Sequence, residues 1–320
     1  MSQTEILLEK DPLEMRQAYA ETILALAQAD PNVIALEADL MSAISTNKIQ
    51  AKIPDQIINC GIMEANMMGI AAGLSLTGRI PFVHTFAQFA TRRAFDQLFV
   101  SCAYAQLNVK ILGSDAGITA EHNGGTHMSF EDLGLVRLIP QATVYEASDS
   151  TMLKALLQQS YEEYGIHYIR TIRKNAVKLY EEGESFPKGK GKMLRNGNDI
   201  ALVASGLMVS EAIKAANELK KRGIDAMVID MYSIKPIDAD LLVKAAKQTG
   251  NIITIENHNV IGGLGSAVAE TLSEIYPVPI KRLGVREKFG QVGLTEYLKN
   301  YYGLTANEIV ETARELLRKK

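Results

Sequence analysis

The stretch NCGIMEANMMGIAAGLSLTG, residues 59–78, carries one charged side chain, Glu64, in a run of apolar and small residues. The apolar residues recur at helical spacing and leave almost no polar face, so we expect a buried helix. Burial disfavours an ionised carboxylate, so Glu64 must either keep its proton to a higher pH than an exposed glutamate or meet a cation. Position alone leaves a structural ion pair and a catalytic carboxylate equally open.

The next stretch, PFVHTFAQFATRRAFDQLF at residues 81–99, adds two phenylalanines. Together the two stretches resemble the pyrimidine-binding domain of the transketolase family. The resemblance implies that Glu64 contacts the aminopyrimidine ring of thiamine diphosphate and that Phe86 and Phe89 pack on this ring. It also implies that Asp39 lies near the cofactor, and that Arg92 stands where some members carry a ring-packing tyrosine and others an arginine. Without Glu64, the two phenylalanines would more simply be core residues one helical turn apart.

Length and composition indicate the class of protein. The 320 residues, 47% of them hydrophobic, suit two domains. A net charge of -3 and a pI near 6.0 give no electrostatic footprint for nucleic acid or an anionic membrane. Cys60 and Cys102 are too few for a disulfide framework. The N-terminus lacks a signal-peptide pattern and no apolar run is long enough to span a membrane. We expect a soluble, cytoplasmic protein with no nucleic-acid or membrane partner.

Alternating helix and strand patterns predict an α/β fold with two domains, each built on a parallel or mostly parallel sheet. We expect the domains at residues 1–177 and 198–320, with a Gly-, Pro- and charge-rich linker at 178–197. In the first domain, a long helix is expected at 86–105, and the irregular segment 113–132 is expected to be a functional loop. In the second, IGGLG at 261–265 opens a helix and makes either a tight turn or a weaker candidate for a phosphate cradle.

The segments SIKPID (233–238) and ENHNVIGGLGSAV (256–268) also resemble the transketolase C-terminal domain, so the resemblance covers nearly the whole chain. The Gly-Asp-Gly signature by which the family's diphosphate-binding domain holds a divalent metal is absent from the sequence. The resemblance therefore implies one subunit of a split transketolase. The thiamine diphosphate tail and its Mg²⁺ would then be held by a separate N-terminal subunit, and we predict no metal ligands in this chain.

The same resemblance implies an assembly. In the family the cofactor lies between two protomers, so we expect a two-fold symmetric heterotetramer with two active sites. Its pyrimidine-binding domains are expected to self-associate through apolar helices such as residues 65–76. We expect this chain alone to be inactive.

Three residues stand where transketolases bind a sugar phosphate: Arg16, Ser42 and Arg173. Guanidinium groups suit a terminal phosphate, although each residue alone would more often be a solvated surface group. His127 matches a histidine that many members direct at the substrate, and is otherwise as readily a turn-stabilising donor.

Two positions depart from the family pattern. Asp115 stands in place of a histidine that contacts the donor sugar, and Asn123 in place of an aspartate that reads the configuration at the donor's second carbon. His122, beside Asn123, is a candidate to compensate. The departures leave the substrate open, including another anion such as a sulfonate in place of the phosphate.

The resemblance thus implies a thiamine diphosphate-dependent transketolase of carbohydrate metabolism, as in the pentose phosphate reactions. It would transfer a two-carbon ketol unit from a ketose phosphate to an aldose phosphate. One alternative is the E1 beta subunit of a 2-oxo-acid dehydrogenase, which we would expect to lack paired Arg16 and Arg173. The other is a non-catalytic homologue, which we would expect to have lost Glu64. The sequence does not say which ketose and aldose are used.

Overall fold

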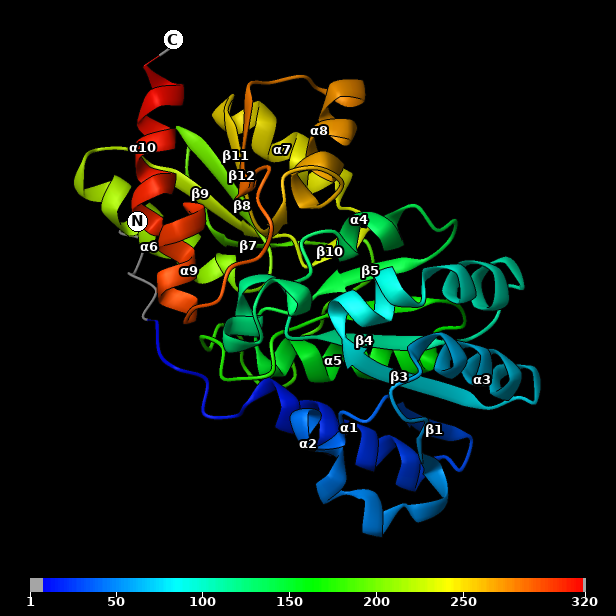
Figure 1. The fold of residues 1–320 in the computed structure, drawn as a ribbon. Coiled ribbons are helices and arrows are strands. Elements are labelled where there is room, and N and C mark those ends of the chain that lie inside the picture. Colours follow the sequence, from blue (N-terminus) through cyan, green and yellow to red (C-terminus); the bar gives the residue numbers. More distant parts are fainter. Residues whose placement is uncertain (1–7, 319–320) are drawn as a thin grey trace.

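The larger sheet has seven strands in the order β10-β5-β6-β4-β3-β1-β2, in a computed structural model that describes residues 8–318 (Figure 1). Neighbouring strands run parallel except β10, which is antiparallel to β5. The inner strands are continuous buried runs, as expected for parallel strands covered on both faces. The strands are β1 Val33–Glu37, β2 Ile57–Asn59, β3 Ile80–Phe86, β4 Lys110–Ser114, β5 Thr143–Glu146, β6 His167–Arg170 and β10 Ser233–Lys235.

Helices cover both faces of this sheet because the side chains of each strand alternate. Val33 and Ala35 of β1 pack into a core with α1 and α5, whereas Ile34 and Leu36 pack into a core with α3. The helices of this domain are α1 Met15–Ala29, α2 Met41–Ile44, α3 Glu64–Leu76, α4 Asp132–Arg137 and α5 Ser150–Glu162.

The helix expected at residues 86–105 is not a single α-helix. Strand β3 continues to Phe86, which pairs with Ser114 of β4. The chain then winds in two π-helical segments, Phe89–Arg93 and Gln97–Tyr104. Apolar spacing predicts that a helix is present but does not separate α from π winding, and π-helical turns are frequent at functional sites.

The smaller sheet has five strands in the order β12-β11-β8-β9-β7, all parallel except β7. Helices α6 and α10 pack on one face, and α7 and α8 on the other. Strand β7 lies within the stretch expected to be linker, and α9 was not expected. The elements are β7 Lys192–Arg195, β8 Ile200–Ala204, α6 Met208–Lys221, β9 Ala226–Asp230, α7 Ala239–Thr249, β11 Ile252–Asn259, α8 Leu264–Ile275, β12 Ile280–Val285, α9 Thr295–Tyr302 and α10 Ala306–Leu317.

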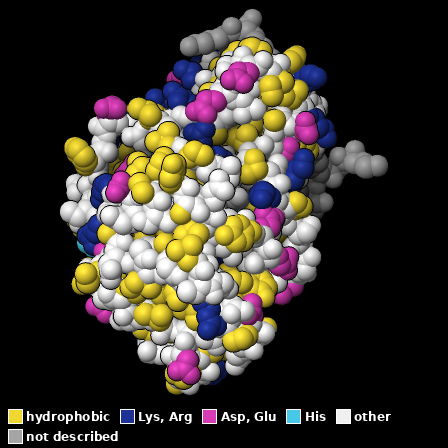
Figure 2. Space-filling model, turned by 90° about the vertical axis from the view of Figure 1, so that its right-hand side faces the viewer, with side chains coloured by type: hydrophobic (Ala, Val, Ile, Leu, Met, Phe, Trp, Pro, Cys, Tyr) yellow, Lys and Arg dark blue, Asp and Glu magenta, His cyan; other side chains and the backbone are white. Residues whose placement is uncertain are grey.

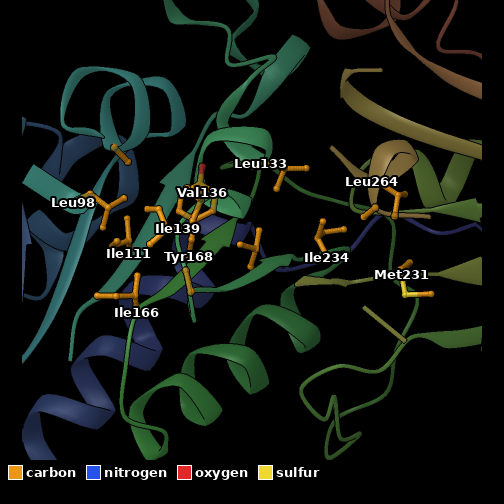
Figure 3. Close-up of a cluster of buried hydrophobic side chains, with 14 of the residues drawn as sticks. Leu98, Ile111, Leu133, Val136, Ile139, Ile166, Tyr168, Met231, Ile234 and Leu264 are labelled. Atoms are coloured by element: carbon orange, nitrogen blue, oxygen red, sulfur yellow. The ribbon is translucent and has the colours of Figure 1, made fainter. Parts of the chain in front are cut away.

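These two sheets confirm the predicted fold class, and the structure joins them into one body. After β9 of the second domain, the chain crosses over and β10 pairs with β5 at the edge of the first sheet. Around this crossover, Leu133 and Val136 of α4 share a buried apolar cluster with Ile234 of β10 and Leu264 of α8 (Figure 3). Within residues 8–318, no helix has the length and apolar character needed to cross a membrane.

A fully buried arginine lies where the two domains meet. Arg170, the last residue of β6, bonds through Nε to Asp132 Oδ2 at 2.8 Å and through Nη1 to Glu146 Oε1 at 2.5 Å. Its Nη2 donates to the carbonyl oxygen of Asn257 in the second domain at 2.8 Å. Ser205, also from the second domain, donates to the other oxygen of Glu146. The guanidinium group is therefore satisfied only when both domains are in place.

Replacing Arg170 with methionine should destabilise the protein severely. Asp132 and Glu146 would remain buried without their cation, which costs about 3–5 kcal/mol for a broken buried pair. Chemical denaturation at pH 7 measures the loss. Arg222→Met is the matched control, because Arg222 forms only an exposed ion pair with Glu311, and it should leave the unfolding midpoint unchanged.

Lowering the pH should narrow the difference in unfolding free energy between wild type and Arg170→Met. Burial alone would raise the pKa of Asp132, but the charges of Arg170 and His258 hold it below its usual value. A depressed carboxyl pKa stabilises the fold above the ordinary aspartate pKa of about 4 and ceases to do so as the pH falls through the lower folded-state pKa. If the difference in stability between the two proteins were the same at every pH, the buried charges would not be the cause of the stability loss in Arg170→Met.

Candidate active site

Glu64 is the first residue of α3, and its carboxylate is buried with only one oxygen engaged. The side chain is 2% exposed. Oε1 accepts a hydrogen bond from Arg93 Nη1 at 2.8 Å, whereas Oε2 has no hydrogen-bond partner among the described residues. Of the two alternatives that the sequence left open, a retained proton or a cation, the structure provides a cation, Arg93, and leaves the second oxygen without a partner among the described residues.

Three rings lie beside this carboxylate and are called here the ring cluster: Phe86, Phe89 and His127. The centroids of Phe86 and Phe89 are 6.2 Å apart with an interplanar angle of 28°. His127 stands edge-on to both, at 6.0 Å and 5.2 Å. The guanidinium carbon of Arg93 lies 3.8 Å from the Phe89 centroid, so one arginine connects the ring cluster with Glu64.

A pocket of about 310 Å³ opens beside Phe89, His127 and Arg93. Gln88 is fully buried on its wall, yet neither atom of its amide has a partner within residues 8–318. Arg92 also lines the pocket and pairs with Glu131 at 3.0 Å. A pocket with aromatic faces and unsatisfied polar atoms suits a flat, polar, heteroaromatic ligand. Its lining residues are Gln88, Phe89, Arg92, Arg93, Thr126 and His127.

On the other side of Phe86, Arg173 and Asp115 form an ion pair. Arg173 Nε lies 3.1 Å from Asp115 Oδ1, and the guanidinium carbon lies 5.7 Å from the Phe86 centroid. Asp115 is buried and its Oδ2 has no partner in the described chain. Burial raises the pKa of Asp115 to about 6, although Arg173 opposes the rise. The backbone N–H of Arg16 donates to the carbonyl of Arg173, so the structure brings these two arginines together.

The remaining predicted residues are exposed. Asp39 exchanges hydrogen bonds with Asn59 at 3.0 and 3.2 Å, in the turn after β1. Ser42 lies on α2, which packs against the helix that carries Arg16. Asn123 is exposed in the loop before His127. His122, the candidate to compensate for Asn123, is exposed as well.

Sequence reasoning missed Arg93 and Gln88. A buried glutamate demands a cation, and Arg92 and Arg93 are adjacent, so the signal was present but did not tell which arginine turns inward. Gln88 stands between the two phenylalanines of FAQF, a position that could have identified it. Neither Arg93 nor Gln88 belongs to a sequence motif of its own.

The IGGLG segment makes a tight turn. The buried carboxylate of Glu256 accepts the N–H groups of Leu264 and Gly265 at 2.7 and 2.9 Å. The N-terminus of α8 is therefore capped by the chain itself, because a carboxylate there complements the helix dipole. This contradicts the phosphate-cradle interpretation.

Residues 11–178 match the model of the transketolase pyrimidine-binding domain, and residues 189–309 match that of the transketolase C-terminal domain. The chain is 49% identical over 306 residues to 6-deoxy-6-sulfo-D-fructose transketolase subunit SqwH of Clostridium sp. (strain MSTE9), covering 96% of this chain and 95% of that protein. It is 35% identical over 305 residues to an apulose-4-phosphate transketolase subunit of Phocaeicola vulgatus, covering 95% and 97% of the two chains.

A solved structure described as a split gene transketolase, inactive beta4 tetramer, is also similar. It superimposes with a TM-score of 0.88 at 40% identity, covering 96% of this chain and 98% of that chain. The protein belongs to the transketolase family. Its counterparts among these relatives are subunits of split transketolases, as the sequence analysis predicted.

The arrangement predicts the protonation of His127. Burial and the nearby charge of Arg93 lower the pKa of His127 below its ordinary value, so the imidazole stays neutral further into acid. Nitrogen-detected NMR titration, assigned with His127→Asn, measures this pKa. Arg93→Gln removes the second cause and should move the midpoint upward. An unchanged midpoint in Arg93→Gln would contradict the placement of the guanidinium group.

Proposed function

We propose that this chain is the catalytic pyrimidine-binding subunit of a thiamine diphosphate-dependent transketolase. It transfers a two-carbon ketol unit from a ketose to an aldose. The observation that carries the proposal is the buried Glu64 carboxylate, with one unpartnered oxygen beside the ring cluster. This is the combination that an aminopyrimidine needs, because the ring requires one hydrogen-bonding group at its edge and apolar contact on its face.

The residues of this chain would have separate roles at the site. Bound thiamine diphosphate supplies the carbanion chemistry that breaks and forms the carbon–carbon bonds. Glu64 would present Oε2 to the edge of the pyrimidine ring and exchange a proton with it, in line with general acid–base function. Phe86 and Phe89 pack on the ring face, and Gln88, Asp39 and Arg92 surround the cofactor. His127, kept neutral by its surroundings, faces the substrate.

The donor's anionic end would lie at Arg173 and Arg16, whose backbones adjoin and whose side chains suit a fork of oxygen acceptors. Ser42, Asp115 and Asn123 complete the proposed substrate residues. One relative is named for 6-deoxy-6-sulfo-D-fructose and another for apulose-4-phosphate, so both terminal anions occur among similar subunits. We propose a ketose with a 6-sulfonate as the donor of this chain, because the similarity to that relative is 49% end to end.

A second subunit would supply the rest of the site. The sequence contains no Gly-Asp-Gly signature, and residues 8–318 hold no group of three or more His, Cys, Asp or Glu suited to a metal ion. The diphosphate and its Mg²⁺ carry most of the cofactor's charge. We propose that the N-terminal transketolase subunit provides their ligands.

Self-association is supported by the surface of α3 and the second π-helical segment. Met67, Met68 and Ala71 of α3 are buried. The sequence predicted a helix buried on all sides, but in the single chain α3 is buried on only part of its surface. Apolar side chains remain exposed on this side, and Figure 2 shows hydrophobic patches across it with few charges between them. Such patches mark contact surfaces. Five of the side chains are more than half exposed: Ile62, Met63, Leu76, Val100 and Tyr104.

Replacing Glu64 with glutamine should keep the fold and the partner but remove most activity. Glutamine fills the same space but cannot pass a proton, so we expect kcat to fall by about 100-fold or more. Ketol transfer by the reconstituted complex measures the effect, with the melting temperature as a check of folding. Glu182→Gln, an exposed carboxylate far from the ring cluster, is the control. Near wild-type turnover in Glu64→Gln would make the assignment of the cofactor site wrong.

This chain purified alone should bind thiamine diphosphate weakly and transfer no ketol units. Calorimetry with thiamine diphosphate and Mg²⁺, before and after addition of a diphosphate-binding subunit, measures the expected gain in affinity. Parallel assays for ketol transfer and for 2-oxo-acid decarboxylation separate a transketolase from an E1 beta subunit. Full ketol transfer by the isolated chain would refute the need for a partner.

A further inference from the structure

We propose that Asp115 makes the anion site of the donor selective for a singly charged sulfonate over a doubly charged phosphate. The inference rests on the proposed function and adds the residue that sets the substrate class. It starts from the position of the carboxylate: Asp115 follows β4 directly, is 1% exposed, and lines the 430 Å³ cavity that Arg173 also lines.

The backbone at Asp115 is held in an unusual conformation. Its φ is 52°, in the left-handed region that non-glycine residues rarely adopt and that costs energy. The neighbouring backbone is fixed from the second domain, because Asn257 bonds both the carbonyl of Ala116 and the N–H of Ile118. The scaffold therefore holds the backbone that carries the carboxylate, and the ion pair with Arg173 holds the side chain.

Several positive side chains around this site already have carboxylate partners. Lys214 and Lys299, which also line the cavity, share Glu211, and Lys10 lines it with no ion pair within residues 8–318. Arg173 is paired with Asp115 at 3.1 Å and Arg16 with Glu14 at 2.6 Å. Lys174 is paired with Glu121 at 2.5 Å. An incoming anion thus meets the Arg173 guanidinium group, which can still donate hydrogen bonds but whose charge is offset by Asp115.

The charge of the ligand then determines which of the two anions binds better. An alkyl sulfonate carries one negative charge, whereas a phosphate monoester loses its second proton near pH 6 and carries nearly two at pH 8. The additional charge of the phosphate faces Asp115 Oδ2, the carboxylate oxygen that has no hydrogen-bond partner in the described chain. Like charges repel strongly in a buried site of low dielectric. A monoanion avoids most of this repulsion and keeps the hydrogen bonds of Arg173.

The test compares two donors with one aldose acceptor in the reconstituted complex at pH 8. Wild type should show a higher kcat/KM for 6-deoxy-6-sulfofructose than for fructose 6-phosphate. Asp115→Asn keeps the shape and removes the charge, so the ratio of the two kcat/KM values should shift toward the phosphate by about tenfold. Asp115→Ser serves as a second uncharged variant.

Binding gives a readout that does not depend on turnover. The 6-phosphate and the 6-deoxy-6-sulfonate of a hexitol lack the carbonyl and cannot react, so calorimetry reports their affinities alone. Asp115→Asn should strengthen binding of the phosphate more than of the sulfonate. Glu296→Gln removes an exposed carboxylate that lines the same cavity and should leave both ratios unchanged.

The possible failures are distinguishable. A wild-type complex that transfers ketol units from neither ketose would overturn the proposed function. A complex that transfers them, but with the same donor ratio and the same hexitol affinities in Asp115→Asn as in wild type, would overturn the role of Asp115 and leave the proposed function standing. If Glu296→Gln shifted the donor ratio equally, the selectivity would arise from the general charge of the cavity and not from Asp115.

Discussion

A buried guanidinium group tolerates no missing partner, and Arg170 obtains its partners from both domains. Removing such a charge from water is costly unless ion pairs and hydrogen bonds replace the lost hydration. Asp132 and Glu146 supply the charge from the first domain, and the Asn257 carbonyl completes the set from the second. This requirement fixes the orientation of the domains, which hydrophobic contact alone would leave free to slide, because apolar burial has no direction.

Asn257 connects the buried Arg170 with the candidate active site. Its main chain serves Arg170, and its side chain holds the loop that begins at Asp115. Further along this loop, Glu121 accepts hydrogen bonds from Thr295, and the backbone of Gly125 lies close against that of Gly290, both from the second domain. The loop that carries His127 is thus positioned by the neighbouring domain, and the second domain contributes to the site without contributing a ring-cluster residue.

Much of the fold could be predicted because apolar periodicity is local. The α/β class with two mostly parallel sheets, and the helix that IGGLG opens, occur as predicted. Strands β7 and β10 were missed because each is short and exists through pairing with a strand distant in sequence. Helix α9 was missed because its sequence is mostly polar. The π winding was missed because it changes the hydrogen-bond partner and leaves the composition unaltered.

The site could be predicted in part for the same reason. The need of Glu64 for a cation follows from its apolar surroundings, but the choice of Arg93 depends on how the π-helical segment turns. The pair of Asp115 and Arg173 joins residues from two separate strands' ends, and nothing local relates them. The roles given to Asp39, Ser42, Arg92, Asn123 and the other proposed ligands stay predictions.

The crossover of β10 has a consequence for how the protein can be divided. A fragment that stops at the linker would lose β10 and leave β5 as an open edge strand, with unpaired N–H and C=O groups that invite aggregation. The complementary fragment would carry β10 with no sheet to join. The boundary between the two domains is therefore not one at which the polypeptide can be cut, and recombination between relatives must exchange both domains together.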